Sequence, residues 1–292
     1  MTDTAWEPHT VVTEELIDPA PVTALAALFD DGLPAPAPGD PLPPLWHWVA
    51  LPRWSASTRL SVDGHPFRGS FLPPIELPRR MFAGGSVAFT GEIKVGDTVR
   101  REAVVESVTE KNGRSGKLVI VVTSTTLYTP DGAPALTEKQ NIIYREAAAP
   151  SAGTAPAPEA AAALVPAGAP IVAAGADTWD FRTDPTLLMR FSAATANAHR
   201  IHYDWPYATG VEGYPGLVVH GPLMTLSLAE AHRLSGDPET VTELEHRNAA
   251  PLFCGQTASL RARRTESGKT VELFGPKGVE GGAGTVLELT LN

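Results

Sequence analysis

Residues 89–146 read FTGEIKVGDTVRREAVVESVTEKNGRSGKLVIVVTSTTLYTPDGAPALTEKQNIIYRE. Three runs rich in β-branched residues are separated here by Asn112-Gly113 and Asp131-Gly132, and such dipeptides favour tight hairpin turns. The pattern therefore predicts an antiparallel meander of strands.

A second stretch near the end of the chain has the same texture. Residues 252–292 read LFCGQTASLRARRTESGKTVELFGPKGVEGGAGTVLELTLN, and Cys254-Gly255-Gln256-Thr257 echoes Val95-Gly96-Asp97-Thr98 at the same place in the strand series. A repeated pattern of this kind indicates two similar halves.

Each strand series is preceded by a helical stretch. Leu217–Arg233 (LVVHGPLMTLSLAEAHR) carries apolar residues at helical spacing, and Pro222 suits a first turn, so a helix is expected to begin near Gly221. A shorter helix is expected from Val22 to Phe29. The pattern assigns no structure to residues 76–86, ELPRRMFAGGS.

The length of 292 residues favours two domains. Residues 147–176 are almost entirely Ala, Pro, Gly and Ser, which is typical of a linker. We therefore expect an N-terminal domain over 1–146 and a C-terminal domain over 177–292. The pattern alone predicts two α+β halves.

Composition excludes several classes of function. A formal net charge of -10 and a pI near 5.3 provide no basic surface for nucleic acid or an anionic membrane. The opening MTDTAWEPHT lacks the features of a secretory signal, and no apolar run approaches about 18 residues, so a cytoplasmic protein is expected. Cys254 is the only cysteine, which rules out an intramolecular disulfide and a thiolate metal cluster.

The densest polar cluster lies in residues 191–208, FSAATANAHRIHYDWPYA. His199, His202 and Asp204 could in principle bind a metal. Arg200 would place a fixed cation beside it, however, and no further ligand cluster is evident, so no metal is expected. A polar surface loop is the simpler alternative, but six functional side chains in eight positions favour a site.

Residues 195–202, TANAHRIH, resemble the S/T-G-D-x-N-P-I-H motif of the MaoC-like, R-specific enoyl-CoA hydratase superfamily. Residues 212–228, EGYPGLVVHGPLMTLSL, resemble the segment that opens the central helix in that superfamily. Together they resemble the double hot-dog subgroup of mesaconyl-C4-CoA hydratases and mitochondrial 3-hydroxyacyl thioester dehydratases. PLWHWVALPRW (44–54) and LPRRMFAGGSVAF (77–89) resemble its N-terminal, fatty-acid-synthase-like dehydratase domain.

The resemblance implies a tandem hot-dog α+β fold, in which antiparallel sheets each wrap a central helix, and a hydratase or dehydratase acting on an acyl thioester. It implies that His202 is the acid/base and that the Gly221 N–H at the helix start binds the developing enolate oxygen. Asn197 replaces the superfamily's catalytic aspartate, and an amide can hold water but cannot accept its proton. In the favoured version Asn197 holds the water by hydrogen bonds while His202 carries out the proton transfer alone. A less favoured version assigns His199 as a second acid/base.

Arginines and aromatic residues are expected to bind the rest of the substrate. Arg200 could grip a second carboxylate in a mesaconyl- or itaconyl-like acyl group, or pair with Asp204 or a coenzyme phosphate. Further contacts with the substrate carboxylate, the CoA phosphates or the acyl chain are expected from Arg79, Arg80, His199, Tyr203, Tyr214 and His220. Aromatic packing is the simpler alternative for the two tyrosines, and a surface pair is the alternative for Arg79 and Arg80. The first half would complete the pocket without catalysing the reaction, since neither Glu76 nor His65 has a recognisable partner there.

Four other functions stay open: dehydration of an acyl-carrier-protein substrate, hot-dog thioesterase activity, a non-catalytic binding subunit, and a secondary-metabolism enzyme. Hot-dog thioesterases usually place a carboxylate near the start of the central helix. The corresponding stretch here, VVHGPLMT, contains no Asp or Glu, which speaks against thioesterase activity. The expected partner is the coenzyme A thioester substrate itself, with no metal or redox cofactor. The sequence leaves a homodimer open and does not define the acyl chain, stereochemistry or physiological direction.

Overall fold

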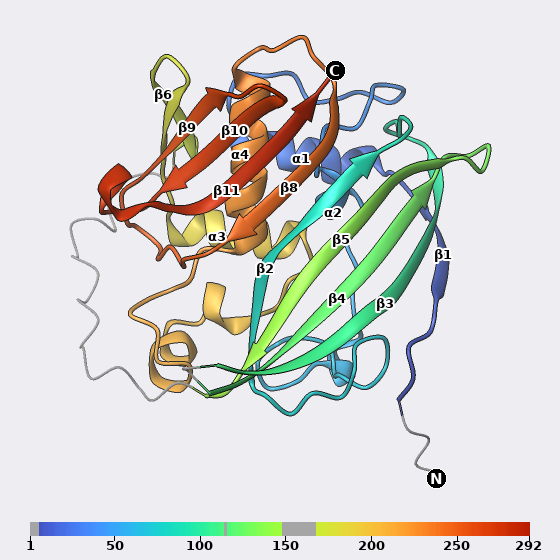
Figure 1. The fold of residues 1–292 in the computed structure, drawn as a ribbon, viewed down its shortest axis with the longest axis vertical. Helices are drawn as coiled ribbons and strands as arrows, with labels where there is room; N and C mark the ends of the chain where they lie inside the picture. Colours follow the sequence, from blue (N-terminus) through green and yellow to red (C-terminus); the bar gives the residue numbers. More distant parts are fainter. Residues whose placement is uncertain (1–5, 114–115, 148–167) are drawn as a thin grey trace.

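The computed structural model describes residues 6–113, 116–147 and 168–292 (Figure 1). Its strands form an eleven-stranded sheet in the order β1-β3-β4-β5-β2-β8-β11-β10-β9-β7-β6. The first half contributes β1 (Val11–Leu16), β2 (Arg79–Phe89), β3 (Thr98–Gly113), β4 (Gly116–Tyr128) and β5 (Pro134–Arg145). The second half contributes β6 (Ile171–Gly175), β7 (Thr178–Phe181), β8 (Val241–Asn248), β9 (Ala258–Arg264), β10 (Gly268–Phe274) and β11 (Ala283–Leu291).

Both predicted meanders are confirmed. Strands β3, β4 and β5 are consecutive antiparallel neighbours, and the turn between β4 and β5 falls at Asp131-Gly132, where Gly132 has a positive φ of 87°. Strands β9, β10 and β11 pair in the same way in the second half. Asp131-Gly132 therefore marks a reversal of the chain, as predicted. Asn112 and Gly113 belong instead to the end of β3, where they pair with Lys117 and Gly116 of β4.

Strand β2 occupies the segment whose structure the pattern did not assign. It pairs with β5 on one side, through Arg80 and Tyr144 among others, and with β8 on the other, from Gly84↔Arg247 to Ala88↔Glu243. Two arginines and two glycines hide its alternation in the sequence. The pairing of β2 with β8 joins the halves and leaves neither strand with an open edge.

The longest described helix is α4 (Gly221–Leu234), which packs against β8 to β11 in the upper part of Figure 1. It begins at Gly221, as predicted, and every residue from Leu223 to His232 is buried. The first half carries the shorter helices α1 (Pro19–Phe29) and α2 (His47–Ala50). Helix α1 contains the predicted 22–29 helix and begins earlier, at Pro19, because Asp18 caps its first turn through a bond to Ala20 N–H (2.8 Å).

The predicted linker is too long at its C-terminal end. Residues 171–175 form the edge strand β6, which pairs with β7 through Ile171↔Phe181, and Ile171 is buried. The Ala-rich composition concealed this strand, whose apolar content lies at one end. Residues 148–167 of the predicted linker lie outside the described residues.

The two halves share one packed interior. The largest buried apolar cluster takes residues from both, and the Trp46 indole N–H donates to Glu230 of α4 (3.2 Å). Arg190 on α3 (Pro185–Ala194) donates to the Ala27 carbonyl of α1 (3.1 Å). The described part of the chain contains no helix long and apolar enough to cross a membrane.

Glu230 gives this shared interior a pH-dependent stability. Its side chain is fully buried, and burial raises its pKa to about 7, against the opposing charge and hydrogen bond of Arg233. The folded pKa of Glu230 lies above its unfolded value of 4.5. The stability that protonated Glu230 contributes is therefore fully present below about pH 4.5 and is lost as the pH rises through about 7.

The variant Glu230→Gln, which cannot ionise, is therefore expected to lose less stability than the wild type between about pH 5 and pH 8. Thermal unfolding of both proteins at the two pH values measures this difference. An equal fall in Tm for both proteins would contradict it.

Candidate active site

A cavity of about 640 Å³ lies between the two halves. The first half lines it with the inner faces of β2 to β5, helix α2 and His65. The second half lines it with residues from Phe191 to His202, the start of α4, and the loop 248–251. The two predicted motifs of the second half therefore meet at one cavity, which the first half completes.

His202 ends the short 3-10 turn η3 (Arg200–His202) and lines this cavity. Its Nδ1–H donates to the Val218 carbonyl oxygen over 2.7 Å, which leaves the lone pair on Nε2. Burial lowers its pKa well below the usual value, and His220 and His199 lower it further. His202 is therefore neutral at ordinary pH and competent to accept a proton at Nε2.

His220 lies under His202 and outside the cavity, so its assignment as a substrate-binding residue is wrong. The two rings stack with centroids 3.6 Å apart, and His220 Nε2 bonds to the Ser192 hydroxyl (2.8 Å). Burial lowers the pKa of His220 to about 3. The residue is the N-cap of α4, so its side chain turns into the core and packs beneath His202.

Gly221 is the first residue of α4 and lines the cavity. Among the described residues, no group accepts a hydrogen bond from its N–H. A Cβ at this position would lie 3.2 Å from the Phe82 ring, so glycine keeps the approach to the helix terminus open. The N–H group and the helix dipole together favour a negatively charged oxygen here.

Asn197 stands at the cavity wall in a tight turn. Its Oδ1 accepts the His199 backbone N–H (3.0 Å), and the preceding Ala196 has a positive φ of 51°. This left-handed conformation costs energy for a residue with a Cβ. The turn fixes the Asn197 amide beside His199 and His202, where it can hold a water molecule.

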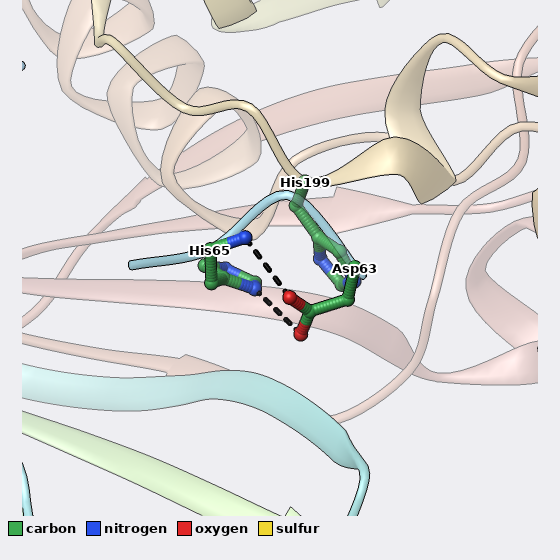
Figure 2. Close-up of side chains that lie close together, drawn as sticks. All are labelled: Asp63, His65 and His199. Carbon is green, nitrogen blue, oxygen red and sulfur yellow. Dashed lines mark hydrogen bonds and ion pairs between the residues drawn. The ribbon is translucent and has the colours of Figure 1, made fainter. Parts of the chain in front are cut away.

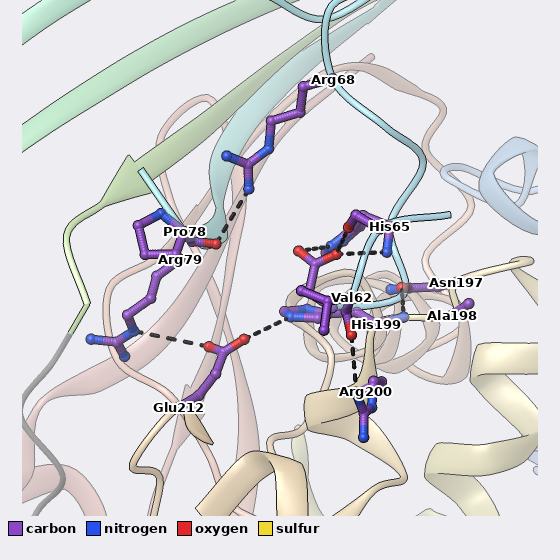
Figure 3. A network of polar contacts seen from close by, with 12 residues as sticks. Val62, His65, Arg68, Pro78, Arg79, Asn197, Ala198, His199, Arg200 and Glu212 are labelled. Carbon is purple, nitrogen blue, oxygen red and sulfur yellow. Dashed lines mark hydrogen bonds and ion pairs between the residues drawn. The ribbon is translucent and has the colours of Figure 1, made fainter. Parts of the chain in front are cut away.

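His199 also lines the cavity, and it has a carboxylate partner that the sequence did not reveal. Its Nε2 lies 3.2 Å from Glu212 Oε1, and the Glu212 Oε2 atom lies 3.9 Å from Arg79 Nε (Figure 3). Glu212 is buried and is the first residue of the EGYPGL segment quoted above. Its position at the start of a recognised motif was the available indication.

A loop of the first half completes this arrangement. Asp63 Oδ2 lies 3.1 Å from His65 Nδ1, Asp63 Oδ1 accepts the His65 backbone N–H (2.9 Å), and the His65 ring packs against His199 with centroids 4.2 Å apart (Figure 2). The Asp63 carbonyl also accepts the Arg200 N–H (2.9 Å). His65 therefore has partners, contrary to the sequence-based expectation. Asp63 lies two residues before it in the chain, whereas His199 is brought to it by the fold.

The charges of this loop are set by burial and pairing. Burial lowers the pKa of His65 to about 3, and the charge of Arg80 lowers it further. Burial alone would raise the pKa of Asp63, but the hydrogen bond and charge of His65 hold it well below the usual range. Potential metal-ligating atoms of Asp63, His65 and His199 lie within 4.8 Å of one another. The sequence-based expectation that no further metal-ligating residues accompany His199 is therefore wrong.

Two residues predicted to bind substrate face away from the cavity. Both the Nε and Nη2 atoms of Arg200 donate to Asp204 Oδ2 (2.9 and 2.7 Å), and its Nη1 donates to the Val62 carbonyl (3.1 Å). Tyr203 is 46% exposed, and its hydroxyl donates to the Ala198 carbonyl (2.9 Å). The η3 turn points Ile201 and His202 inward and therefore turns their neighbours outward.

The other predicted binding residues, Arg79, Arg80 and Tyr214, do line the cavity. The Arg79 guanidinium lies over the Tyr214 ring, 4.9 Å from its centroid. Arg80 is half-buried, and its side chain has no hydrogen bond or ion pair within the described ranges. It is therefore a cation in the cavity wall that is available to a ligand.

The family model for hydroxyacyl-thioester dehydratase type 2 matches residues 45–254. Mesaconyl-C(4)-CoA hydratase of Chloroflexus aurantiacus is 43% identical over 286 residues, which cover 97% of this chain and 96% of that protein. HtdX of Mycobacterium tuberculosis has a similar fold, with a TM-score of 0.64, 21% identity, and coverage of 96% and 98%. A second M. tuberculosis structure, described as a double hotdog fold, has a TM-score of 0.56 with 16% identity and coverage of 99% and 96%. The predicted tandem hot-dog fold is confirmed.

Proposed function

This chain belongs to the hydroxyacyl-thioester dehydratase type 2 family, and from that membership we propose that it hydrates a short dicarboxylic enoyl-CoA of the mesaconyl type. It is a hydro-lyase that adds or removes water at the double bond of an acyl thioester. The observation that carries the substrate class is the Arg80 guanidinium, which lines the same cavity as His202 and has no partner among the residues that the structure describes.

In the hydration direction, His202 Nε2 takes a proton from water while the water oxygen bonds to the β-carbon. Negative charge then moves to the thioester oxygen, where the Gly221 N–H and the helix terminus stabilise it. Asn197 holds the water by its amide. A proton delivered to the α-carbon completes the reaction, and dehydration follows the same steps in reverse.

Arg80 is suited to the second carboxylate of the acyl group. Arg80 lines the same cavity as His65, His199 and His202, and after burial its charge is among the causes that lower the pKa of His65. In a five-carbon diacid such as mesaconate the free carboxylate is only a few bonds from the reacting double bond. A guanidinium bound to that carboxylate would supply a charge-assisted contact that a simple enoyl group cannot make.

The proposed function is tested by mixing purified protein with mesaconyl-C4-CoA, itaconyl-CoA and crotonyl-CoA. Loss of the absorbance of the conjugated thioester measures turnover, and mass spectrometry identifies water addition. We expect the highest kcat/KM with the dicarboxylic substrates. Turnover of none of these thioesters, or a clear preference for crotonyl-CoA, would contradict the proposal.

Arg80→Met is expected to raise KM for mesaconyl-C4-CoA by about 10- to 100-fold, because a hydrogen bond to a charged group contributes about 1.5–3 kcal/mol. KM for crotonyl-CoA should change little. Steady-state kinetics with both substrates makes the comparison, and Arg59→Met, at an exposed position outside the cavity, is the control. An equal rise with both substrates would instead assign Arg80 to a phosphate of CoA.

We also propose that catalysis needs no metal or redox cofactor, because water addition is redox-neutral and imidazole groups can move both protons. A cytoplasmic location is proposed as well, supported by the bacterial source of the mesaconyl-C(4)-CoA hydratase relative. Association as a homodimer is left to measurement by light scattering.

A further inference from the structure

We propose that His199 is the second proton-transfer residue of this site, which rests on the proposed function. In the hydration direction it would deliver the proton to the α-carbon while His202 accepts the proton of water. Glu212, Asp63 and His65 would be positioning residues that hold the His199 ring.

The hydrogen bonds of His202 leave it a single nitrogen for proton exchange. Its Nδ1–H is committed to the Val218 carbonyl oxygen (2.7 Å), so Nε2 is the one nitrogen that can exchange a proton with a ligand. Asn197 lines the cavity at the position of the superfamily's aspartate, but its amide cannot accept or release a proton at ordinary pH. His202 acting alone would have to relay the proton of water to the α-carbon through this single nitrogen, whereas a second histidine would let separate groups carry out the two transfers.

His199 meets the requirements of such a group. It lines the same cavity as His202 and Gly221, and its ring centroid lies 5.5 Å from that of His202. The protonated ring can donate Nε2–H to the buried Glu212 carboxylate, 3.2 Å away, which stabilises the positive charge before the proton at the other nitrogen is given up. The proton balance closes when His202 returns the proton taken from water to solvent and His199 regains one.

The loop containing Asp63 and His65 holds the other side of the ring. His65 packs on His199 at 4.2 Å and is itself fixed by Asp63, whose carboxylate also accepts a hydrogen bond from Ser61. The backbone bond from Arg200 N–H to the Asp63 carbonyl ties this loop to the residue after His199. The ring is therefore held from both halves of the chain, as a residue that must present one nitrogen to a substrate requires.

The charged and titratable groups around His199 come from several elements. His202 and His220 face it from its own half, Glu212 binds it, and Tyr207 and Arg79 face Glu212. From the first half, Asp63 and His65 face it, with Arg80 beyond them. The pH dependence of the hydration rate must therefore be compared between single variants before its rise or fall is assigned to His199.

His199→Gln is expected to lower kcat for mesaconyl-C4-CoA by about 10²-fold or more, with a small change in KM, because general acid catalysis contributes about 10²–10⁴-fold. An acid must be protonated to act, so the wild-type hydration rate should fall at high pH, and this alkaline limb should vanish in His199→Gln. His232→Gln is the matched control, because His232 is a buried histidine next to a carboxylate (Asp237, 3.8 Å) but lies outside the cavity. It should keep the wild-type kcat and pH profile.

Two further variants keep the test decisive if His199→Gln folds poorly by circular dichroism. Glu212→Gln, which keeps the shape but not the charge, should lower kcat and move the alkaline limb. Asn197→Asp added to His199→Gln should recover part of the lost kcat, because it restores a carboxylate at the position of the superfamily's aspartate.

Three results would overturn the proposal. The first is a kcat of His199→Gln within about threefold of the wild type, and the second is an alkaline limb that persists unchanged in it. The third is loss of wild-type activity in EDTA with recovery on adding Zn²⁺ or Mn²⁺, since His199 would then be a metal ligand beside Asp63 and His65. Wild-type protein inactive on every thioester would instead count against the proposed function, so the two failures are distinguishable.

Discussion

His202→Ala is expected to lower kcat by about 10³-fold or more with little change in KM, because the variant loses the group that takes the proton from water. Alanine also removes the ring that stacks on His220 at 3.6 Å and the bond to the Val218 carbonyl. The measurement is the initial rate of mesaconyl-C4-CoA hydration, with the product identified by mass.

The companion variant His202→Gln keeps a polar side chain of similar length and tests whether packing alone explains the loss. It should be as inactive as His202→Ala while unfolding closer to the wild-type temperature. If either folded variant kept more than about a tenth of the wild-type kcat, His202 would not be the central acid/base.

Gly64→Ala is expected to have the second largest effect, on both stability and activity. Gly64 has a φ of 92°, and a Cβ there would lie 1.8 Å from the Ala198 carbonyl oxygen, a backbone atom of the segment between Asn197 and His199. Strain of this kind costs about 1–3 kcal/mol, and the overlap must also push the two loops apart. A misplacement of about 1 Å near the chemistry can lower the rate by about 10²-fold.

Gly69→Ala is the matched control for this experiment. Gly69 has the same φ of 92°, but a Cβ there would meet only the Pro74 side chain at 3.6 Å. Both variants therefore carry the backbone strain, whereas only Gly64→Ala disturbs the catalytic segment. Urea denaturation and kcat/KM should be measured on both, and equal losses in the two variants would show that the contact between the loops has no catalytic role.

The elements that were predicted well from the sequence are those specified by residues close together in the chain. Asp131-Gly132 and the β-branched runs specify β4 and β5, and Pro222 after Gly221 specifies the start of α4. Strand β2 was not predicted, because Arg79, Arg80 and two glycines interrupt its alternation and its pairing with β5 and β8 is a property of the assembled sheet.

The site was predicted in part for the same reason. The TANAHRIH motif identified the segment and its histidines, but not which side chains point inward, so Arg200 and Tyr203 were placed in the cavity although both face outward. Asp63 and His65 are far from His199 in the chain. Contacts between such residues depend on how the halves pack, and no local pattern records them.

The junction of β2 and β8 has a consequence for symmetry. A homodimer of two identical hot-dog subunits, related by a two-fold axis, must present the same residues on both sides of its interface. In this chain the two sides are free to differ, and they do: one side has the fourteen-residue helix α4 and the other the four-residue helix α2. Substitutions near Asp63 or Arg80 should therefore be analysed as active-site substitutions, although they lie in the other half of the gene product from His202.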